Sequence, residues 1–159
     1  MNVGEMTVVA IVKPDNATGT YQIASRDNGS GTRHWQLAQS GTRVVFTGFN
    51  ASTSAAIQTP AGVLAAGVWA MITARVDANG KIQIWVNGVL KSWNYMLAGP
   101  MRSTSGSLLR LGARSTTPTE SFDGTMAYFA WYGATDTELR NNIETRARLI
   151  ASGKGITLP

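Results

Sequence analysis

The sequence predicts an all-β fold, a two-sheet antiparallel jelly-roll sandwich that ends in one C-terminal amphipathic helix. Short segments of alternating apolar and polar residues recur along the chain, separated by turn residues, which indicates roughly nine to eleven strands. Glycine is abundant, at 17 of 159 residues, whereas charged residues make up only 14%, as in β-proteins with many tight turns. Strands of unequal length with one apolar side favour a sandwich over a barrel.

The strongest β-signal lies within residues 73–90. Aliphatic residues alternate with other side chains along 82–86, after a turn at 77–80, and Asn87-Gly88 supplies a second tight turn. Because successive strand residues point to opposite faces, Trp85 is placed on the face opposite the aliphatic residues.

The remaining elements follow from the same alternation and from the turn residues between them. We expect strands at residues 6–13, 20–26, 33–38, 43–49, 55–58, 68–76, 81–86, 89–93, 108–113 and 126–132.

The periodicity becomes helical only near the C-terminus. Thr135 and Glu138 have the spacing of a capping box, and apolar residues then recur at helical intervals to Ile150. A helix is therefore predicted over about 136–151. No repeat or linker divides the chain, so residues 1–159 are predicted to form a single domain.

Composition excludes several classes of function. The chain has no cysteine and a single histidine, His34, so disulfides, thiolate chemistry and a zinc site are not expected. The net charge is +5, but the basic residues are scattered, which argues against nucleic-acid binding. No apolar run reaches membrane-spanning length and no signal peptide is evident, so we expect cytoplasmic synthesis without membrane insertion.

Several segments, in chain order, resemble motifs of the concanavalin A-like lectin/glucanase superfamily, in its laminin-G-like branch. They are TVVAIVKP (7–14), VWAMITARVD (68–77), IQIWVNGV (82–89), LRLGA (109–113) and FDGTMAYFAWY (122–132). The resemblance covers about residues 6–150 and implies a concanavalin A-like sandwich. This fold hosts lectins, adhesion modules, hydrolases and structural parts, so the resemblance predicts fold more than function.

Family domains begin with an extra strand ahead of the first of these motifs, and only five residues precede Met6 here. We therefore expect an open sheet edge, covered by the tail 155–159 or by a neighbouring subunit. The tail itself resembles endings of laminin-G-like domains from bacteriophage particles.

Catalysis is not expected. Hydrolases of this superfamily carry Glu-x-Asp-x-x-Glu on one strand, and no Glu of this chain lies in that pattern. A Ser-His-Asp triad would have to use His34, but the sequence contains no nucleophile-elbow motif to accompany it. We also expect no cofactor. Calcium is an alternative at 27–31 and 77–80, but a single carboxylate in each segment is explained by turn formation.

A glycan or a partner chain is the expected ligand of the face that carries Trp85. An exposed aromatic ring beside amide, guanidinium and hydroxyl groups can stack on a sugar and bond its hydroxyls. The alternative is that Trp85 is simply covered by a loop, a terminal segment or a partner. The predicted residues of this face are Trp85, Arg75, Gln83, His34 and Tyr128.

Trp93 and Tyr95 form a second aromatic candidate after a turn, where the strand 89–93 ends. Loops at the ends of a sandwich often hold ligands, so the pair is either a ligand site or an anchor. The sequence thus favours a non-catalytic structural or attachment module of a larger assembly, such as a phage virion surface, that forms homo-oligomers and acts at a virion or extracellular surface. The alternatives are a carbohydrate-binding lectin-like module and, third, a glycanase.

Overall fold

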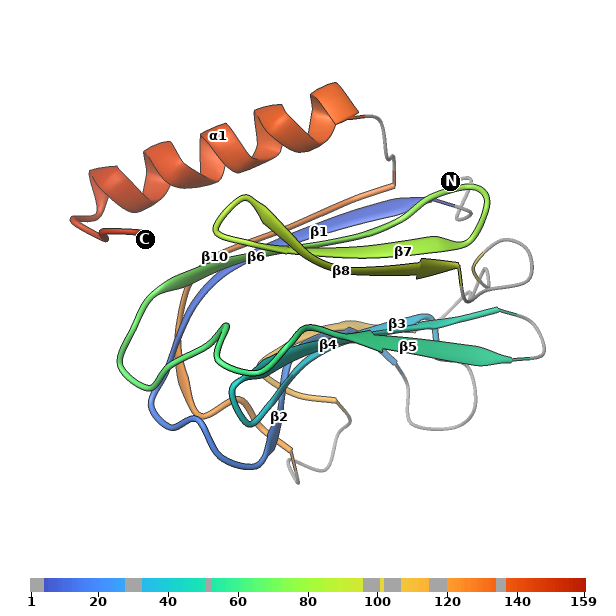
Figure 1. Ribbon diagram of the computed structural model, residues 1–159, viewed down its shortest axis with the longest axis horizontal. Helices are drawn as coiled ribbons and strands as arrows, with labels where there is room; N and C mark the ends of the chain where they lie inside the picture. The colour runs from blue at the N-terminus through green and yellow to red at the C-terminus, as the bar shows by residue number, and fades with distance from the viewer. Residues whose placement is uncertain are drawn as a thin grey trace.

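The computed structural model describes residues 5–27, 33–50, 53–95, 101, 107–114, 120–133 and 137–159. The chain forms two five-stranded antiparallel sheets stacked face to face, with one helix outside them (Figure 1). Sheet A has the strand order β10-β1-β6-β7-β8, and sheet B has the order β5-β4-β3-β2-β9.

Sheet A consists of β1 (Met6–Pro14), β6 (Ala70–Val76), β7 (Lys81–Val86), β8 (Val89–Tyr95) and β10 (Gly124–Tyr132). Sheet B consists of β2 (Thr20–Arg26), β3 (Trp35–Ser40), β4 (Arg43–Phe49), β5 (Ser54–Gln58) and β9 (Leu109–Leu111). The helix α1 spans Thr137–Gly153. The predicted fold class is therefore confirmed, and every predicted strand is present with bounds shifted by at most a few residues.

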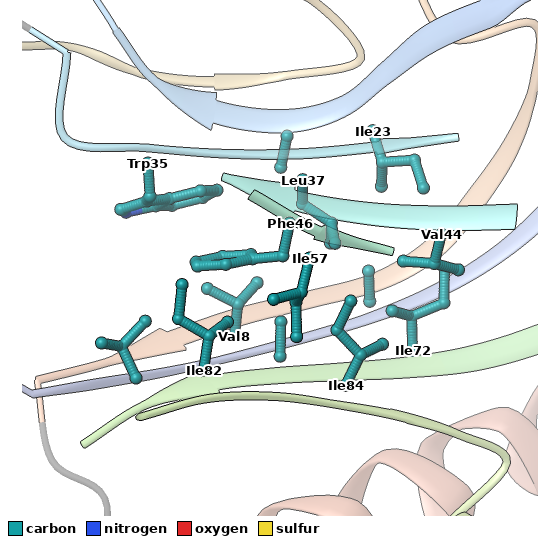
Figure 2. Packing of buried hydrophobic residues seen from close by; sticks show 14 of the residues in the cluster. Val8, Ile23, Trp35, Leu37, Val44, Phe46, Ile57, Ile72, Ile82 and Ile84 are labelled. Atoms are coloured by element: carbon teal, nitrogen blue, oxygen red, sulfur yellow. The ribbon is translucent and has the colours of Figure 1, made fainter. Parts of the chain in front are cut away.

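The core lies between the two sheets (Figure 2). Trp35 is fully buried, and its ring lies nearly parallel to those of Phe46 and Phe129, with both centroids 6.4 Å away and interplanar angles of 16° and 17°. Trp131 adds a tilted contact at 6.3 Å. This aromatic stack joins β3 and β4 of sheet B to β10 of sheet A.

Strand β1 is buried on both of its faces. Val8 is one of its residues that point into the main core, whereas Val9 and Ile11 point to the outer face and are also fully buried. They pack against Ile143 and Ala147 of α1 in a second apolar cluster. The helix therefore closes the outer face of sheet A, as Figure 1 shows.

The two predicted hairpins of sheet A are confirmed. Asn87 and Gly88 have φ values of 55° and 85°, as a two-residue type I′ turn requires, and they join β7 to β8. The amide oxygen of Asn87 also accepts a hydrogen bond from Met71 N at 2.8 Å. In the other turn, Asp77 Oδ1 accepts bonds from Asn79 N and Lys81 N, which is the role that the sequence indicates.

Strand β10 forms one edge of sheet A, since it pairs with β1 on one side and with no strand on the other among the described residues. The tail does not cover this edge with a strand. Gly155, at φ 70°, instead turns the chain after the helix, and Ile156 and Leu158 pack onto the second apolar cluster. The predicted capping residue Thr135 lies outside the described residues.

Replacement of Trp35 by alanine is expected to lower the free energy of unfolding by about 3–5 kcal/mol, because it leaves a cavity in the aromatic stack. Chemical denaturation measures this loss. Trp93→Ala is the matched control, since Trp93 is 54% exposed and its loss should cost less than about 1 kcal/mol. Equal losses in the two variants would contradict the assignment of Trp35 to the core.

Candidate functional site

The outer face of sheet A carries most of the residues that the sequence predicts as a binding site. In the strand register, Arg75 lies opposite Gln83, and Gln83 lies opposite Trp93, so the three form a row across β6, β7 and β8. The next row contains Thr73 and Trp85. The predicted orientation of these side chains is therefore correct, and their exposure decides what they can bind.

Trp85 is not the exposed ring that a glycan site on this face requires. Only 7% of its surface is accessible, and the guanidinium of Arg140 on α1 lies 4.6 Å from the centre of its ring. Arg148 of the same helix donates a 2.7 Å hydrogen bond to the carbonyl of Asn87, just beyond Trp85 in the chain. Trp85 therefore serves as a packing surface for α1, which is the alternative that the sequence left open.

Trp93 and Tyr95 remain exposed, at 54% and 61%. Trp93 ends the predicted strand 89–93, and β8 continues past it to Tyr95, so both rings lie in the edge strand and not in a loop after it. Their rings meet edge-on with centroids 6.1 Å apart. The ammonium of Lys81 lies 4.7 Å from the Trp93 ring centre and 5.6 Å from that of Tyr95. We call Lys81, Gln83, Trp93 and Tyr95 the aromatic edge.

Arg75 borders the aromatic edge from the neighbouring strand. It is half-buried, and its Nε is shielded from solvent without a hydrogen-bond partner in the described part of the chain. Its register position places it next to Gln83. Guanidinium, amide and ammonium donors therefore lie beside two exposed rings.

His34 does not join this face, so its predicted place in the site is wrong. It precedes β3 of sheet B and is 1% exposed. Its ring meets Trp131 edge-on at 6.4 Å, and its Nδ1 lies 3.4 Å from Nη1 of Arg26. The two strands that the sequence places on one face belong to different sheets, which the alternation of residues along each strand does not reveal.

Tyr128 faces the outer side of sheet A, as predicted, but it lies in the cluster beside α1 and away from the aromatic edge. Burial raises the pKa of Tyr128 to about 12, helped by a hydrogen bond with the side chain of Tyr132. Tyr128 therefore stabilises the helix contact as a neutral phenol.

A group of arginines on the outer face of sheet B was not predicted. Asp27 is fully buried there, and its Oδ2 accepts a 2.7 Å hydrogen bond from Nε2 of Gln36. The same oxygen lies 3.4 Å from Nε of Arg33 and 3.6 Å from Nε of Arg114. We call Asp27, Arg33 and Arg114 the arginine cluster. The sequence signal for this cluster was Asp27 itself, and an acidic residue at a turn is already explained by turn formation.

Three further carboxylates in the described ranges have structural partners. Glu120 receives Arg114 Nη1 at 3.4 Å, Asp123 accepts a bond from Asn16, and Asp77 holds its turn. Within the described ranges, no three His, Cys, Asp or Glu residues are grouped so that they could hold a metal ion. Among those same residues, no helix combines the length and hydrophobicity needed to cross a bilayer.

Two stacked antiparallel sheets with Trp35 at their centre define a β-sandwich of the jelly-roll type. Over residues 1–138 the sequence matches the profile of the concanavalin A-like lectin/glucanases superfamily, and the chain belongs to that superfamily. No curated protein sequence matches the chain.

Solved structures of several classes share this fold. The CBM40 module of the Ruminococcus gnavus IT-sialidase, bound to α2,3-sialyllactose, has a TM-score of 0.73 and 17% identity over 87% of this chain and 80% of that chain. Mouse laminin α1 domains LG4-5 have a TM-score of 0.68 and 15% identity over 81% and 36%. The receptor-binding domain of botulinum neurotoxin type G has a TM-score of 0.67 and 16% identity over 92% of this chain and 38% of that chain. At these identities the likeness concerns the fold alone.

The raised pKa of Tyr128 predicts a loss of stability at high pH. The unfolded chain ionises this phenol near pH 10, whereas the folded chain does so near pH 12. The contribution of Tyr128 is therefore complete below pH 10 and is lost as the pH rises through about 12. Chemical denaturation between pH 8 and pH 11.5, as a rough range, should show a smaller decline for Tyr128→Phe than for the wild type. Parallel declines would contradict the assignment.

Proposed function

We propose that this protein is a non-catalytic carbohydrate-binding module whose binding surface is the aromatic edge. The observation that carries the proposal is the pair of exposed rings of Trp93 and Tyr95, held beside the donors of Lys81 and Gln83. A hexose presents an apolar C–H face that stacks on an indole ring, and hydroxyl groups that accept bonds from amide and ammonium groups.

The geometry of the aromatic edge supports a preformed site. Lys81 lies over both rings, and the edge-on contact between them further restricts their rotation. A site whose rings are already ordered loses less conformational entropy when a ligand binds. Strand β8 carries both rings and pairs with β7 along its length, so the backbone beneath them is fixed as well.

Similarity of fold also supports the proposal. The CBM40 module is a carbohydrate-binding module, and its structure was determined with a sialylated sugar. Because the fold hosts several functions, this similarity adds to the argument from the rings but does not replace it. A protein of this kind acts where glycans are displayed, so we propose an extracellular or virion surface as its place of action.

The partners of Asp27, Glu120 and Asp77 support a non-catalytic role. Glycoside hydrolysis uses two carboxyl groups on either side of the scissile bond. Here Asp27 and Glu120 are engaged by arginines, and Asp77 bonds the amides of its own turn. The contacts of each of these three carboxylates therefore give it a structural role.

Trp93→Ala and Tyr95→Ala should each weaken glycan binding by about tenfold or more, because each removes a ring of the platform. A glycan array with the wild type identifies the ligand, and calorimetry then measures its affinity for each variant. Leu149→Ala is the control, since Leu149 is 69% exposed on α1, away from the rings. An array without hits, or affinities that both ring variants retain, would contradict the proposal.

A second candidate is a structural or attachment part of a larger assembly, such as a phage virion surface. Strand β8 favours it, because this edge strand exposes Val89 and Leu90 at 55% and 42% along with its two rings. An unpaired apolar edge can add a strand from a second copy of the chain.

Leu90→Lys is expected to abolish self-association through this edge, because a charge at the edge opposes strand pairing. Sedimentation equilibrium compares it with the wild type and with Leu149→Lys on the helix. A monomeric wild type at high concentration would exclude the homo-oligomer, and an oligomer unchanged in Leu90→Lys would place its interface elsewhere.

A further inference from the structure

The outer face of sheet B differs from that of sheet A, because in the described part of the chain no helix packs on it (Figure 1). Polar residues occupy this face in place of the apolar residues that α1 covers. Ser25 of β2 lies opposite Arg110 of β9, and Gln36 of β3 lies opposite both Ser25 and Thr47 of β4. The arginine cluster adjoins this polar row, because Gln36 bonds the carboxylate of Asp27.

The buried carboxylate of Asp27 organises the cluster. Its side chain has no accessible surface, and one of its oxygens is approached by Gln36, Arg33 and Arg114. A carboxylate removed from solvent is costly unless charged or hydrogen-bonding groups approach it. Asp27 therefore fixes two guanidinium groups next to each other.

These guanidinium groups keep donors available to a ligand. Arg33 and Arg114 approach Asp27 through Nε, and their side chains remain 35% and 31% exposed. Arg114 uses Nη1 for Glu120, whereas Arg33 makes its described polar contact with Asp27 alone. The Arg33 guanidinium also lies 5.8 Å from the ring centre of Phe49, which limits its rotation.

Arg110 adds a third cation on the same face. Its Nη1 is shielded from solvent and has no hydrogen-bond partner in the described ranges. The chain folds back over Ser25 next to it, since Ser25 Oγ donates a 2.9 Å bond to the carbonyl of Ala113. A buried cationic donor without an acceptor is costly, and an anion nearby would satisfy it.

We propose that the arginine cluster, with Arg110, is a binding site for a carboxylate-bearing ligand. A guanidinium group has a planar pair of N–H donors that matches the two oxygens of a carboxylate, and adjacent fixed guanidinium groups bind such an anion more tightly than a single mobile one. Arg33 and Arg114 contact the carboxylate, Asp27 positions them, and Phe49 offers an apolar surface to the rest of the ligand. The site lies on the opposite side of the sandwich from α1 and is independent of the aromatic edge.

Titration with sodium glucuronate and, separately, with glucose tests the proposal, because these two sugars differ in the carboxylate. The arginine Nε–Hε signals in nitrogen–proton correlation spectra report on the cluster directly, and Arg33→Lys and Arg114→Lys assign them by their disappearance. Glucuronate should shift both signals with a common saturation curve, and glucose should shift neither. Equal responses to the two sugars, or no response to glucuronate, would overturn the proposal.

The lysine variants also measure the contribution of the planar guanidinium. Each keeps the charge but loses the paired donors, so glucuronate affinity should fall by about tenfold. Arg43→Lys is the control, because Arg43 lies at the opposite end of the β3–β4 hairpin. Thermal unfolding confirms that each variant is folded. Unchanged glucuronate affinity in both cluster variants would exclude the site. A loss of glycan binding in Trp93→Ala would instead bear on the proposed aromatic edge and leave the arginine cluster untouched.

Discussion

The packing of α1 on the outer face of sheet A is the contact on which the rest of the structure depends. Ile143, Ala147 and Ala151 of the helix cover Val9, Ile11 and Met71, so the central strands of this sheet are buried on both faces. Strands that are buried on both faces read as continuous apolar runs, as β1 does. The helix therefore makes sheet A the inner layer of a three-layer structure, and it determines which part of the sheet still reaches solvent.

Two surfaces of different chemistry follow from this arrangement. On sheet A the helix covers the central strands and Trp85, whereas the β7–β8 side keeps the exposed rings of Trp93 and Tyr95 beside charged and amide groups. On sheet B the described chain places no helix over the outer face, and the polar groups there bond one another around the buried Asp27. The apolar residues between the sheets hold both surfaces at a fixed separation, with the Phe46–Trp35–Phe129 stack linking the two layers.

Much of the fold was predictable because its signals are local. Alternation and turn residues place the strands, and the Asn87-Gly88 turn adopts the positive φ angles that its sequence favours.

The candidate site was less predictable. Alternation correctly gives the face of Trp85, Arg75 and Gln83, but exposure depends on what packs over that face. His34 was grouped with them although its strand belongs to the other sheet, and the strand predicted to end at Trp93 continues to Tyr95. Asp27 gave no distinctive signal, since no sequence pattern links it to its partners Arg33 and Gln36, and Arg114 is far away in sequence.

The sequence by itself determined the strands, the C-terminal helix, the fold class and the face on which each strand residue lies, because periodicity and turn chemistry act over a few residues. Only the tertiary structure decided that α1 lies over sheet A, that Arg140 covers Trp85, and that Trp93 and Tyr95 stay exposed at the edge. It also decided that residues 27, 33 and 114 meet on sheet B. The physical reason is that burial and charge pairing are set by contacts between segments distant in the chain, which no local pattern encodes.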